Sequence, residues 1–248
     1  MKKHLSVFCL MARSSFYKVI LLILAMALVQ ILSFLQNYRN MAIENIISLG
    51  QIVDNSFFSI SFLIALFGII YFLARNTYST NIYYTYFRLN ISLEWVFFWK
   101  VLYSALCFLL LWMIQICLFI GFYKYYAANM GLLIPQYQNM STAFYMSGFM
   151  YTLCPLGNAA GFLDITLFIL LFSICCASVM TNDAAKSSSG FWPFWLIWCL
   201  VTPSSSDFPP HNMFIALILS IIIVIISGII IYQLKHSKEG KYETEDGL

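Results

Sequence analysis

The sequence predicts an all-α integral membrane protein with six transmembrane helices, an N-terminal amphipathic helix at the membrane interface and both termini in the cytoplasm. Three observations lead to this prediction: apolar runs recur along the chain, charged residues are rare, and lysines and arginines are spread unevenly between the loops. Hydrophobic residues make up 62% of the 248 residues and charged residues only 9%, whereas soluble domains carry about 25% charged residues. We therefore expect one transmembrane domain over residues 1–248, with an interfacial helix at 1–18, six spans within 19–234 and a cytoplasmic tail at 235–248.

The first 18 residues are predicted to form an amphipathic helix in the inner membrane interface. Apolar residues recur there at helical spacing, and the basic residues around them can reach lipid headgroups. The apolar residues are Leu5, Phe8, Cys9, Ala12 and Phe16, and the basic ones are Lys2, Lys3 and Arg13. The alternatives are an unstructured basic segment or a signal peptide cleaved after Ala27. The apolar run continues past that alanine to Leu35, which favours an uncleaved first helix.

Six apolar runs are predicted to cross the membrane as helices. A helix rising about 1.5 Å per residue crosses the roughly 30 Å hydrocarbon core in about 20 residues. The fifth run is short and has Pro193 near its start, which a membrane helix tolerates when neighbouring helices satisfy the freed carbonyl. The predicted spans are Val19–Gln36, Ser56–Ala74, Val101–Phe122, Phe162–Met180, Ser188–Thr202 and Met213–Leu234.

Lysine and arginine positions predict the orientation, because cytoplasmic loops are enriched in both. With the N-terminus inside, only Arg39 and Lys124 of the 13 basic residues lie outside. The cytoplasmic flanks then hold Lys2, Lys3, Arg13, Lys18, Arg75, Arg88, Lys100, Lys186, Lys235, Lys238 and Lys241. A seventh span over Ala143–Leu156 would place Lys186 on the wrong side and is too short to cross. We expect that segment to lie on, or dip into, the outer face.

Few polar groups lie in the predicted spans, and this restricts the chemistry that the chain could carry. No ionisable residue is expected near the centre of a span, since Asp164 is placed at the outer end of the fourth span and Lys124 just beyond the third. Buried ionisable residues usually mark proton or ion paths, so a proton- or sodium-coupled transporter and an intramembrane protease are disfavoured. The deepest polar side chains, Gln30 and Gln115, are expected to form interhelical hydrogen bonds.

Sequence motifs for enzymatic chemistry are absent. The chain contains no GxxxxGK[ST] or GxGxxG nucleotide-binding motif and no HExxH. Its seven cysteines lack the spacing of metal ligands, and no basic run that could bind nucleic acid lies outside the span flanks. We therefore expect that the chain is not an enzyme, that it holds no metal or cofactor of its own, and that it has no nucleic-acid partner.

The most informative polar stretch is the loop over residues 75–100, between the second and third spans. It is longer than a connection between neighbouring helices requires, is rich in aromatic residues and carries both signs of charge. Ser92 can cap a helix that continues into the third span, with Glu94 in its first turn. The loop could offer a cytosolic helix to a partner, or it could form an aromatic belt that anchors the helix ends.

Two motifs resemble those of a known family. Arg88-Leu89-Asn90-Ile91-Ser92 is similar to an Arg-Leu-Pro-Ile-Ser element, with Asn90 in place of proline, and residues 143–156 are similar to a Phe-Tyr-x-Ser-x-Phe-x-x-x-Leu-x-Pro-Leu element. With a basic amphipathic start and six spans, this layout resembles the permease subunits of type-2 ABC exporters. It is most similar to the small bacterial permeases linked to the export of, and immunity to, lantibiotics and other antimicrobial peptides.

The resemblance implies a transmembrane subunit of an ATP-driven exporter in the bacterial plasma membrane. Two separate ATPase subunits, holding ATP and magnesium, would drive a pair made of this permease and a second copy or a homologous permease. Tyr86 to Trp95 would form the coupling helix, with Phe87, Arg88, Leu89, Ile91, Ser92, Glu94 and Trp95 as its contact residues.

The substrate is expected to be amphipathic and peptide- or lipid-like, because the spans offer aromatic, methionine and small polar side chains but no charged pocket. The candidate substrate path comprises Gln30, Gln115, Phe144, Met146, Phe149 and Trp195. The alternative is a membrane immunity or sensor protein that does not transport and that binds a peptide at its outer segment, residues 137–156.

Overall fold

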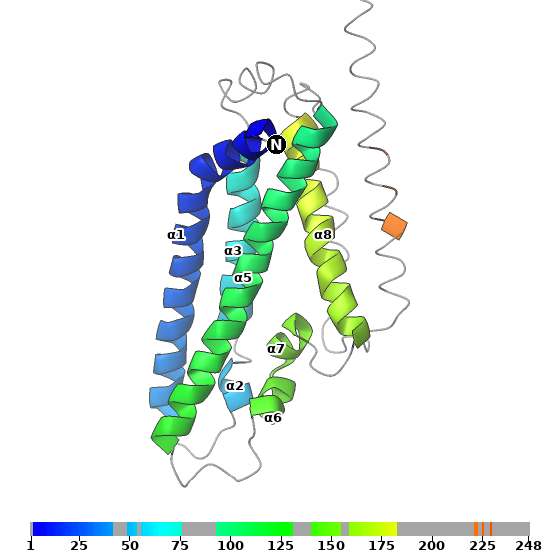
Figure 1. The fold of residues 1–248 in the computed structure, drawn as a ribbon. Coiled ribbons are helices and arrows are strands. Elements are labelled where there is room, and N and C mark those ends of the chain that lie inside the picture. The colour runs from blue at the N-terminus through cyan, green and yellow to red at the C-terminus, as the bar shows by residue number, and fades with distance from the viewer. Residues whose placement is uncertain are drawn as a thin grey trace, which may run out of the picture.

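The computed structural model shows a bundle of helices, with no strand among the residues that it describes (Figure 1). These residues are 2–41, 49–53, 56–75, 93–130, 140–154 and 159–182, together with Ile221, Ile222, Ile225 and Ile229. The helices are α1 (Lys2–Met41), α2 (Leu49–Val53), α3 (Ser56–Arg75), α5 (Leu93–Met130), α6 (Met140–Met146), α7 (Gly148–Leu153) and α8 (Ala159–Asn182).

Four helices of the described part are long and apolar enough to cross a membrane: Met11–Arg39, Ser56–Leu73, Trp95–Ala128 and Gly161–Ser178. They coincide with the first four predicted spans, so the membrane-protein prediction is confirmed at this level. The fifth predicted span lies outside the described residues. Of the sixth, only four isoleucines are described; they are helical, and Ile222 packs against a cluster that contains Phe97 of α5 and Leu171 of α8.

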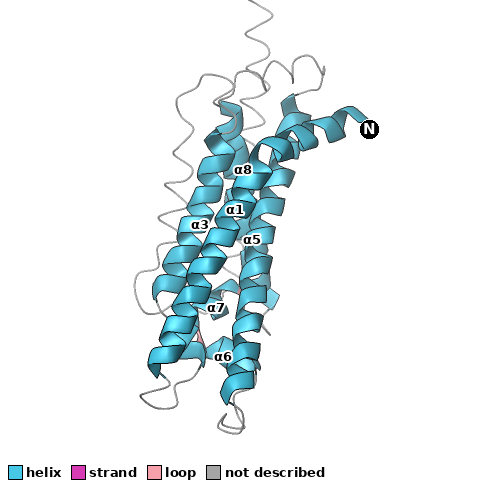
Figure 2. Cartoon of the chain, turned by 90° about the vertical axis from the view of Figure 1, so that its left-hand side faces the viewer, coloured by secondary structure: helices cyan, strands magenta, loops and turns pink. Residues whose placement is uncertain are grey.

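The long helices alternate in direction, as expected for consecutive membrane crossings. The Ser15 and Tyr103 hydroxyls lie 2.8 Å apart near one end of the bundle, and the Phe34 and Phe122 rings stack at 4.5 Å near the other, so α1 and α5 are parallel. The Ser104 hydroxyl donates to the Ser173 carbonyl at 3.1 Å, whereas Trp112, further along α5, meets Phe162 at the start of α8. Helix α8 therefore runs opposite to α5. Figures 1 and 2 show the four helices side by side.

The core consists of two main apolar clusters, one above the other in the view of Figure 1. The upper cluster joins α1, α3, α5 and α8, and the lower cluster joins α1, α3 and α5 to the short helices α2, α6 and α7. The buried members of the upper cluster include Val19, Ile23, Met26, Ala65, Ile69, Cys107, Phe108, Leu111 and Cys176. Those of the lower cluster include Phe34, Leu49, Ile52, Phe58, Phe119, Phe122, Phe144 and Met150.

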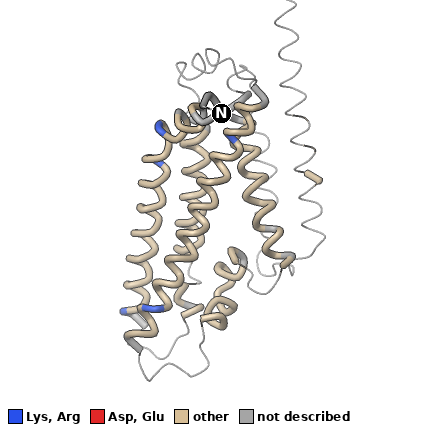
Figure 3. The backbone as a smooth tube through the Cα atoms, viewed as in Figure 1, with Lys and Arg blue, Asp and Glu red and all other residues tan. Residues whose placement is uncertain are grey.

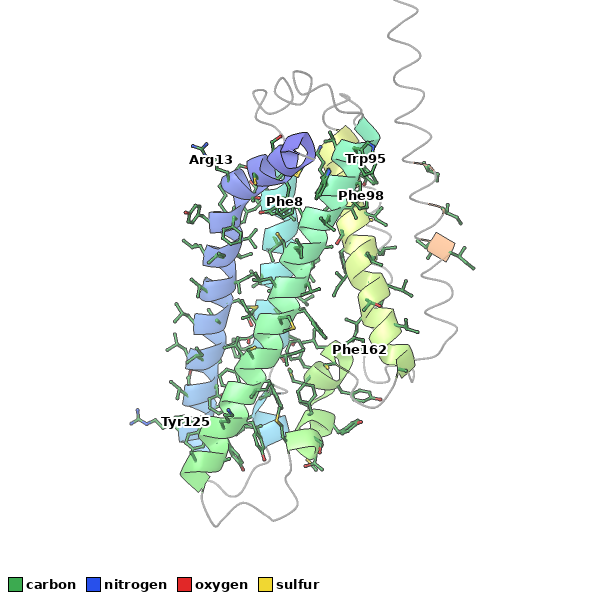
Figure 4. All side chains as sticks on the ribbon, viewed as in Figure 1. Phe8, Arg13, Trp95, Phe98, Tyr125 and Phe162 are labelled. Carbon is green, nitrogen blue, oxygen red and sulfur yellow. The ribbon has the colours of Figure 1, made fainter. Side chains whose placement is uncertain are left out.

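The outer faces of the helices are apolar as well. On α1 a stripe of leucines points away from the bundle, and Figure 4 shows apolar side chains projecting outward along that helix. The stripe contains Leu21, Leu24, Leu28, Leu32 and Leu35. Soluble monomers rarely expose so long an apolar surface, whereas lipid chains cover it without cost.

Helix α1 bends between its first turns and its membrane-spanning part. The first turns run across the upper end of the bundle, and the rest runs alongside α3 and α5 (Figures 1 and 2). The hydroxyls of Ser14 and Ser15 both donate to the Met11 carbonyl, at 3.0 and 2.9 Å, and such back-bonding bends helices. Arg13 lies at the corner (Figure 4). The predicted interfacial helix is therefore continuous with the first span rather than separate from it.

The face that the first turns of α1 present to the bundle differs in part from the predicted one. Phe8 and Ala12 pack against the upper cluster, as expected, but Cys9 and Phe16 are exposed. The Phe8 ring meets the edges of Trp99 and Tyr103 of α5, with ring centroids 6.1 and 5.6 Å apart. These aromatic contacts hold the start of α1 against the start of α5.

Candidate functional site

A layer of polar side chains separates the upper cluster from the lower cluster. Gln30 of α1, Ser61 of α3 and Gln115 of α5 are all buried. Along α1, Gln30 lies between Met26 of the upper cluster and Phe34 of the lower cluster. Along α5, Gln115 lies between Leu111 of the upper cluster and Phe119 of the lower cluster. Three polar groups at one depth among apolar side chains form the polar layer.

The register of α1 and α5 places the two glutamines at nearly the same depth. Residues 88 positions apart contact one another along the interface of these helices, as in Ser15–Tyr103, Phe34–Phe122 and Tyr38–Tyr126. Gln30 is therefore level with Leu118, less than one helical turn beyond Gln115. Leu118 packs against both clusters, which agrees with this depth.

The polar layer has spare hydrogen-bond acceptors. The Gln30 amide nitrogen donates to the Ser61 hydroxyl at 3.1 Å and to the Phe58 carbonyl at 3.4 Å, and the Ser61 hydroxyl also donates to that carbonyl. These contacts confirm the interhelical hydrogen bond predicted for Gln30. The side-chain oxygens of Gln30 and Gln115 are buried and accept no hydrogen bond from the described residues. An unsatisfied acceptor costs about 1–3 kcal/mol, so a donor entering this layer would be held there.

The segment after α5 enters the lower half of the bundle instead of lying across its end. The Trp112 indole donates to the Leu153 carbonyl at 2.6 Å, and Trp112 lies halfway along the candidate span Trp95–Ala128. Further down, Phe119 meets Phe144 of α6, and Phe149 of α7 meets Phe62 of α3. Of the two predicted arrangements, the structure therefore has the one in which this segment dips inward. The α6–α7 pair fills the space between α5 and α8 in Figure 1.

Asp164 lies near the start of α8, and the contacts of that helix place this start within the bundle. Phe162 meets Trp112 at a ring distance of 5.8 Å, so α8 begins well inside the bundle and not at its lower end. Asp164, two residues later, is the fourth residue of the candidate span Gly161–Ser178, so the structure agrees with the prediction that it sits at an end of the fourth span. Lys124 is three helical turns further down α5 from Trp112, so a contact between Asp164 and Lys124 is disfavoured.

The predicted path residues are partly brought together. Phe144 is buried against Phe119, one turn below Gln115, and Phe149 is half-buried. Met146 is 58% exposed, facing away from the core. Trp195 lies outside the described residues. The structure therefore places Phe144 and Phe149 in the lower cluster, below Gln30 and Gln115 of the polar layer, and leaves Met146 at the surface.

Helix α2 packs so closely against α6 that only glycine fits at position 50. A Cβ atom added to Gly50 would lie 2.6 Å from the Met146 Cβ and 3.0 Å from its carbonyl carbon. Backbone atoms cannot move aside as the end of a flexible side chain can, so the two short helices would have to separate.

We therefore expect Gly50→Ala to destabilise the protein by about 1–3 kcal/mol, the usual cost of overpacking. Gly121→Ala is the matched control, since no atom lies within 4 Å of a Cβ built there, and alanine favours the helix. Unfolding in mixed micelles measures both variants. Equal stability of the two would mean that α2 does not pack against α6.

Few of the residues of the predicted coupling loop can be placed. Phe87, Arg88, Leu89, Ile91 and Ser92 lie outside the described residues. Glu94 and Trp95 belong to the first turn of α5, and the Trp95 ring is exposed and meets the edge of Phe98. Helix α5 continues from there to Met130 without a break.

Sequence reasoning missed the burial of Lys100. It was counted among the basic residues of the cytoplasmic flanks, and in the structure it is only 4% exposed, one turn before the buried Ser104 of α5. Among the described residues no group of three or more His, Cys, Asp or Glu side chains could hold a metal ion.

Comparison with known proteins adds no family. No family model matches the chain, and neither the curated proteins nor the solved structures contain a match.

Proposed function

We propose that this chain is the transmembrane subunit of an ATP-driven ABC exporter that moves an amphipathic, peptide- or lipid-like substrate across a bacterial plasma membrane. Two ATPase subunits in separate chains would bind ATP and magnesium, and a second permease would complete the assembly. Six spans and cytoplasmic termini belong to this proposal. Labelling of single cysteines introduced at Asn40 and Tyr242, from outside and inside respectively, tests the orientation.

The observation that carries the proposal is the unbroken helix α5. It starts at Leu93, directly after the loop with the Arg-Leu-x-Ile-Ser element, and reaches the far end of the bundle at Met130. On the way it contacts α1 through Tyr103, the polar layer through Gln115 and the inserted α6–α7 segment through Trp112 and Phe119. A displacement of the loop would therefore move one continuous helix that contacts α1 and the α6–α7 segment and carries Gln115 of the polar layer.

The chemistry of the lower half supports an amphipathic substrate. The lower cluster contains aromatic rings from α1, α3, α5 and α6, and the polar layer above it has two buried amide oxygens that accept no hydrogen bond from the described residues. Peptide N–H or hydroxyl groups could supply such donors, while the rings accommodate apolar groups.

Energy coupling provides the test. Transport should persist when the proton gradient is collapsed and ATP is kept constant, and an ATP-hydrolysing subunit should co-purify with the chain from its native membrane. Asp164→Asn is the sharpest variant, because Asp164 is the acid of the described residues that lies within a candidate span. A loss of transport both in that variant and with an uncoupler at constant ATP would replace this proposal with a proton-coupled carrier.

A second function is favoured by one feature of α6. Tyr145 and Met146 are both more than half exposed at the lower end of the bundle, and the Tyr145 ring lies against Tyr151 of α7. Such a surface could bind a peptide in an immunity or sensor protein that does not transport. Peptide binding that is abolished by Tyr145→Ala, without any co-purifying ATPase, would favour this alternative.

A further inference from the structure

The cations of the described helices gather at the two ends of the bundle, and the lower pair is unusual. Figure 3 shows two blue positions at the lower end, where α1 and α5 end and where the sequence has Arg39 and Lys124. These two residues are also the exceptions to the distribution of basic residues predicted from the sequence. Both side chains are exposed, and neither makes an ion pair with a residue that the structure describes.

Tyrosine contacts bring the two cations together. Tyr38, next to Arg39, meets the edge of Tyr125, next to Lys124, with ring centroids 5.7 Å apart. The register of α1 and α5 places Arg39 level with residue 127, less than one turn below Lys124. Two positive charges thus lie at one depth on neighbouring helices, with tyrosine rings beside them.

The attraction of cations to helix C-termini explains only one of the two. Arg39 lies in the last turn of α1, where the partial negative charge of the helix end stabilises a cation. Lys124 lies more than one turn before the end of α5 at Met130, beyond the reach of that effect. The other described helices at this end, α2 and α6, carry no acidic residue, and the acids nearest in sequence, Glu44 and Asp54, lie outside the described residues.

The depth of the pair matches that of lipid headgroups. Arg39 is the last residue of one candidate span, and Lys124 lies one turn before the end of another. Tyrosine rings with an apolar body and a polar tip are typical of this interface. From this charge complementarity and depth we propose that Arg39 and Lys124, with Tyr38 and Tyr125, form a binding site for the phosphate of an anionic phospholipid in the adjacent leaflet.

The site can be tested with a local reporter on the full chain. Ala128 is exposed one turn beyond Lys124, so a bimane label on Ala128→Cys reports on lipids beside the pair. Cys9, Cys117 and Cys199 are replaced by serine, and the buried cysteines are kept. In phosphatidylcholine nanodiscs, doxyl-labelled phosphatidylglycerol should be enriched near the label by at least fivefold over doxyl-labelled phosphatidylcholine, since each cation near the surface contributes about that factor at low salt.

Arg39→Gln with Lys124→Gln should abolish this enrichment. The matched control, Arg13→Gln with Lys18→Gln, removes the same charge from two exposed residues at the opposite end and should retain it. Native mass spectrometry of the unlabelled chain with phosphatidylglycerol gives a second readout that needs no cysteine changes. Equal quenching by the two lipids, or enrichment that survives the lower double substitution, would overturn the proposal. A third outcome would also overturn it: the enrichment is lost when inorganic phosphate is added but is kept in sodium chloride of equal ionic strength. That result would assign the site to free phosphate.

Discussion

Replacing Trp112 with alanine should destabilise the protein by about 3 kcal/mol or more, the largest effect that we expect from a single substitution. The indole joins three parts of the bundle, because it donates to the Leu153 carbonyl at the end of α7 and packs against Phe162 at the start of α8. Its removal would leave a cavity between α5, α7 and α8 and an unsatisfied carbonyl near mid-depth. Unfolding in mixed micelles gives the change in free energy.

Two further variants separate the parts of this effect. Trp112→Phe keeps an aromatic ring but loses the N–H donor and three ring atoms, so it should cost about 1–3 kcal/mol. Met113→Ala removes a neighbouring side chain that is 47% exposed, and it should change stability by no more than about 0.5 kcal/mol. If Trp112→Phe were as stable as the unmodified protein, the hydrogen bond would not be what holds α7 inside the bundle.

Hydropathy predicted the four described spans because a membrane imposes one simple condition. Backbone polar groups in hydrocarbon must bond within their own segment, so a long apolar run has to be a helix. The second predicted span begins at Ser56, as α3 does, and the fourth begins at Phe162, within the first turn of α8. Helix ends that fall in water are less constrained, and α5 extends beyond its predicted span at both ends.

The bend of α1 had a local signal that was not used. Ser14 and Ser15 follow Met11 at the spacing at which serine hydroxyls bond a preceding carbonyl, and both do so. The amphipathic pattern before Val19 was interpreted as a separate element, but no helix-breaking residue stands between it and the first span. One continuous helix with a bend accounts for the amphipathic pattern and also keeps the backbone hydrogen bonds of the helix.

Depth could not be derived from hydropathy, which reports whether a segment is apolar and not where it lies. Residues 140–153 enter the bundle because Trp112 and Phe119 of α5 supply partners that are distant in sequence. The same packing places the start of α8 beside Trp112, halfway along α5, which hydropathy does not predict. Lys100 is buried for a related reason, since its neighbours Trp99 and Tyr103 lie beneath the first turns of α1. The polar side chain of Gln30 in an apolar span predicted an interhelical hydrogen bond, but the sequence did not identify Ser61 of α3 as its partner.

If the loop before α5 docks on an ATPase, Arg88→Glu combined with Ile91→Asp should lower retention of that ATPase by about tenfold or more. Two anchors would be lost at once, and even one interface anchor is commonly worth more than 1 kcal/mol. Insertion and stability should be retained, because α5 begins only at Leu93 and its contacts with Phe8 and Ser15 lie one or more turns further on. Retention is measured by pull-down of the detergent-solubilised complex.

The control must change charge and apolarity equally at the same end of the bundle. Arg13→Glu combined with Tyr17→Asp does so, since both residues are exposed beside the bend of α1 and Tyr17 is 80% exposed. Retention of the ATPase should be unaffected in this control. An equal loss in both variants would indicate a general effect of negative charge at the membrane surface. Unchanged retention in the loop variant would favour the aromatic belt, in which Phe87, Trp95 and their neighbours only anchor the helix ends. Selective loss in the loop variant would identify the loop before α5 as the docking site of the ATPase, joined through α5 to the polar layer.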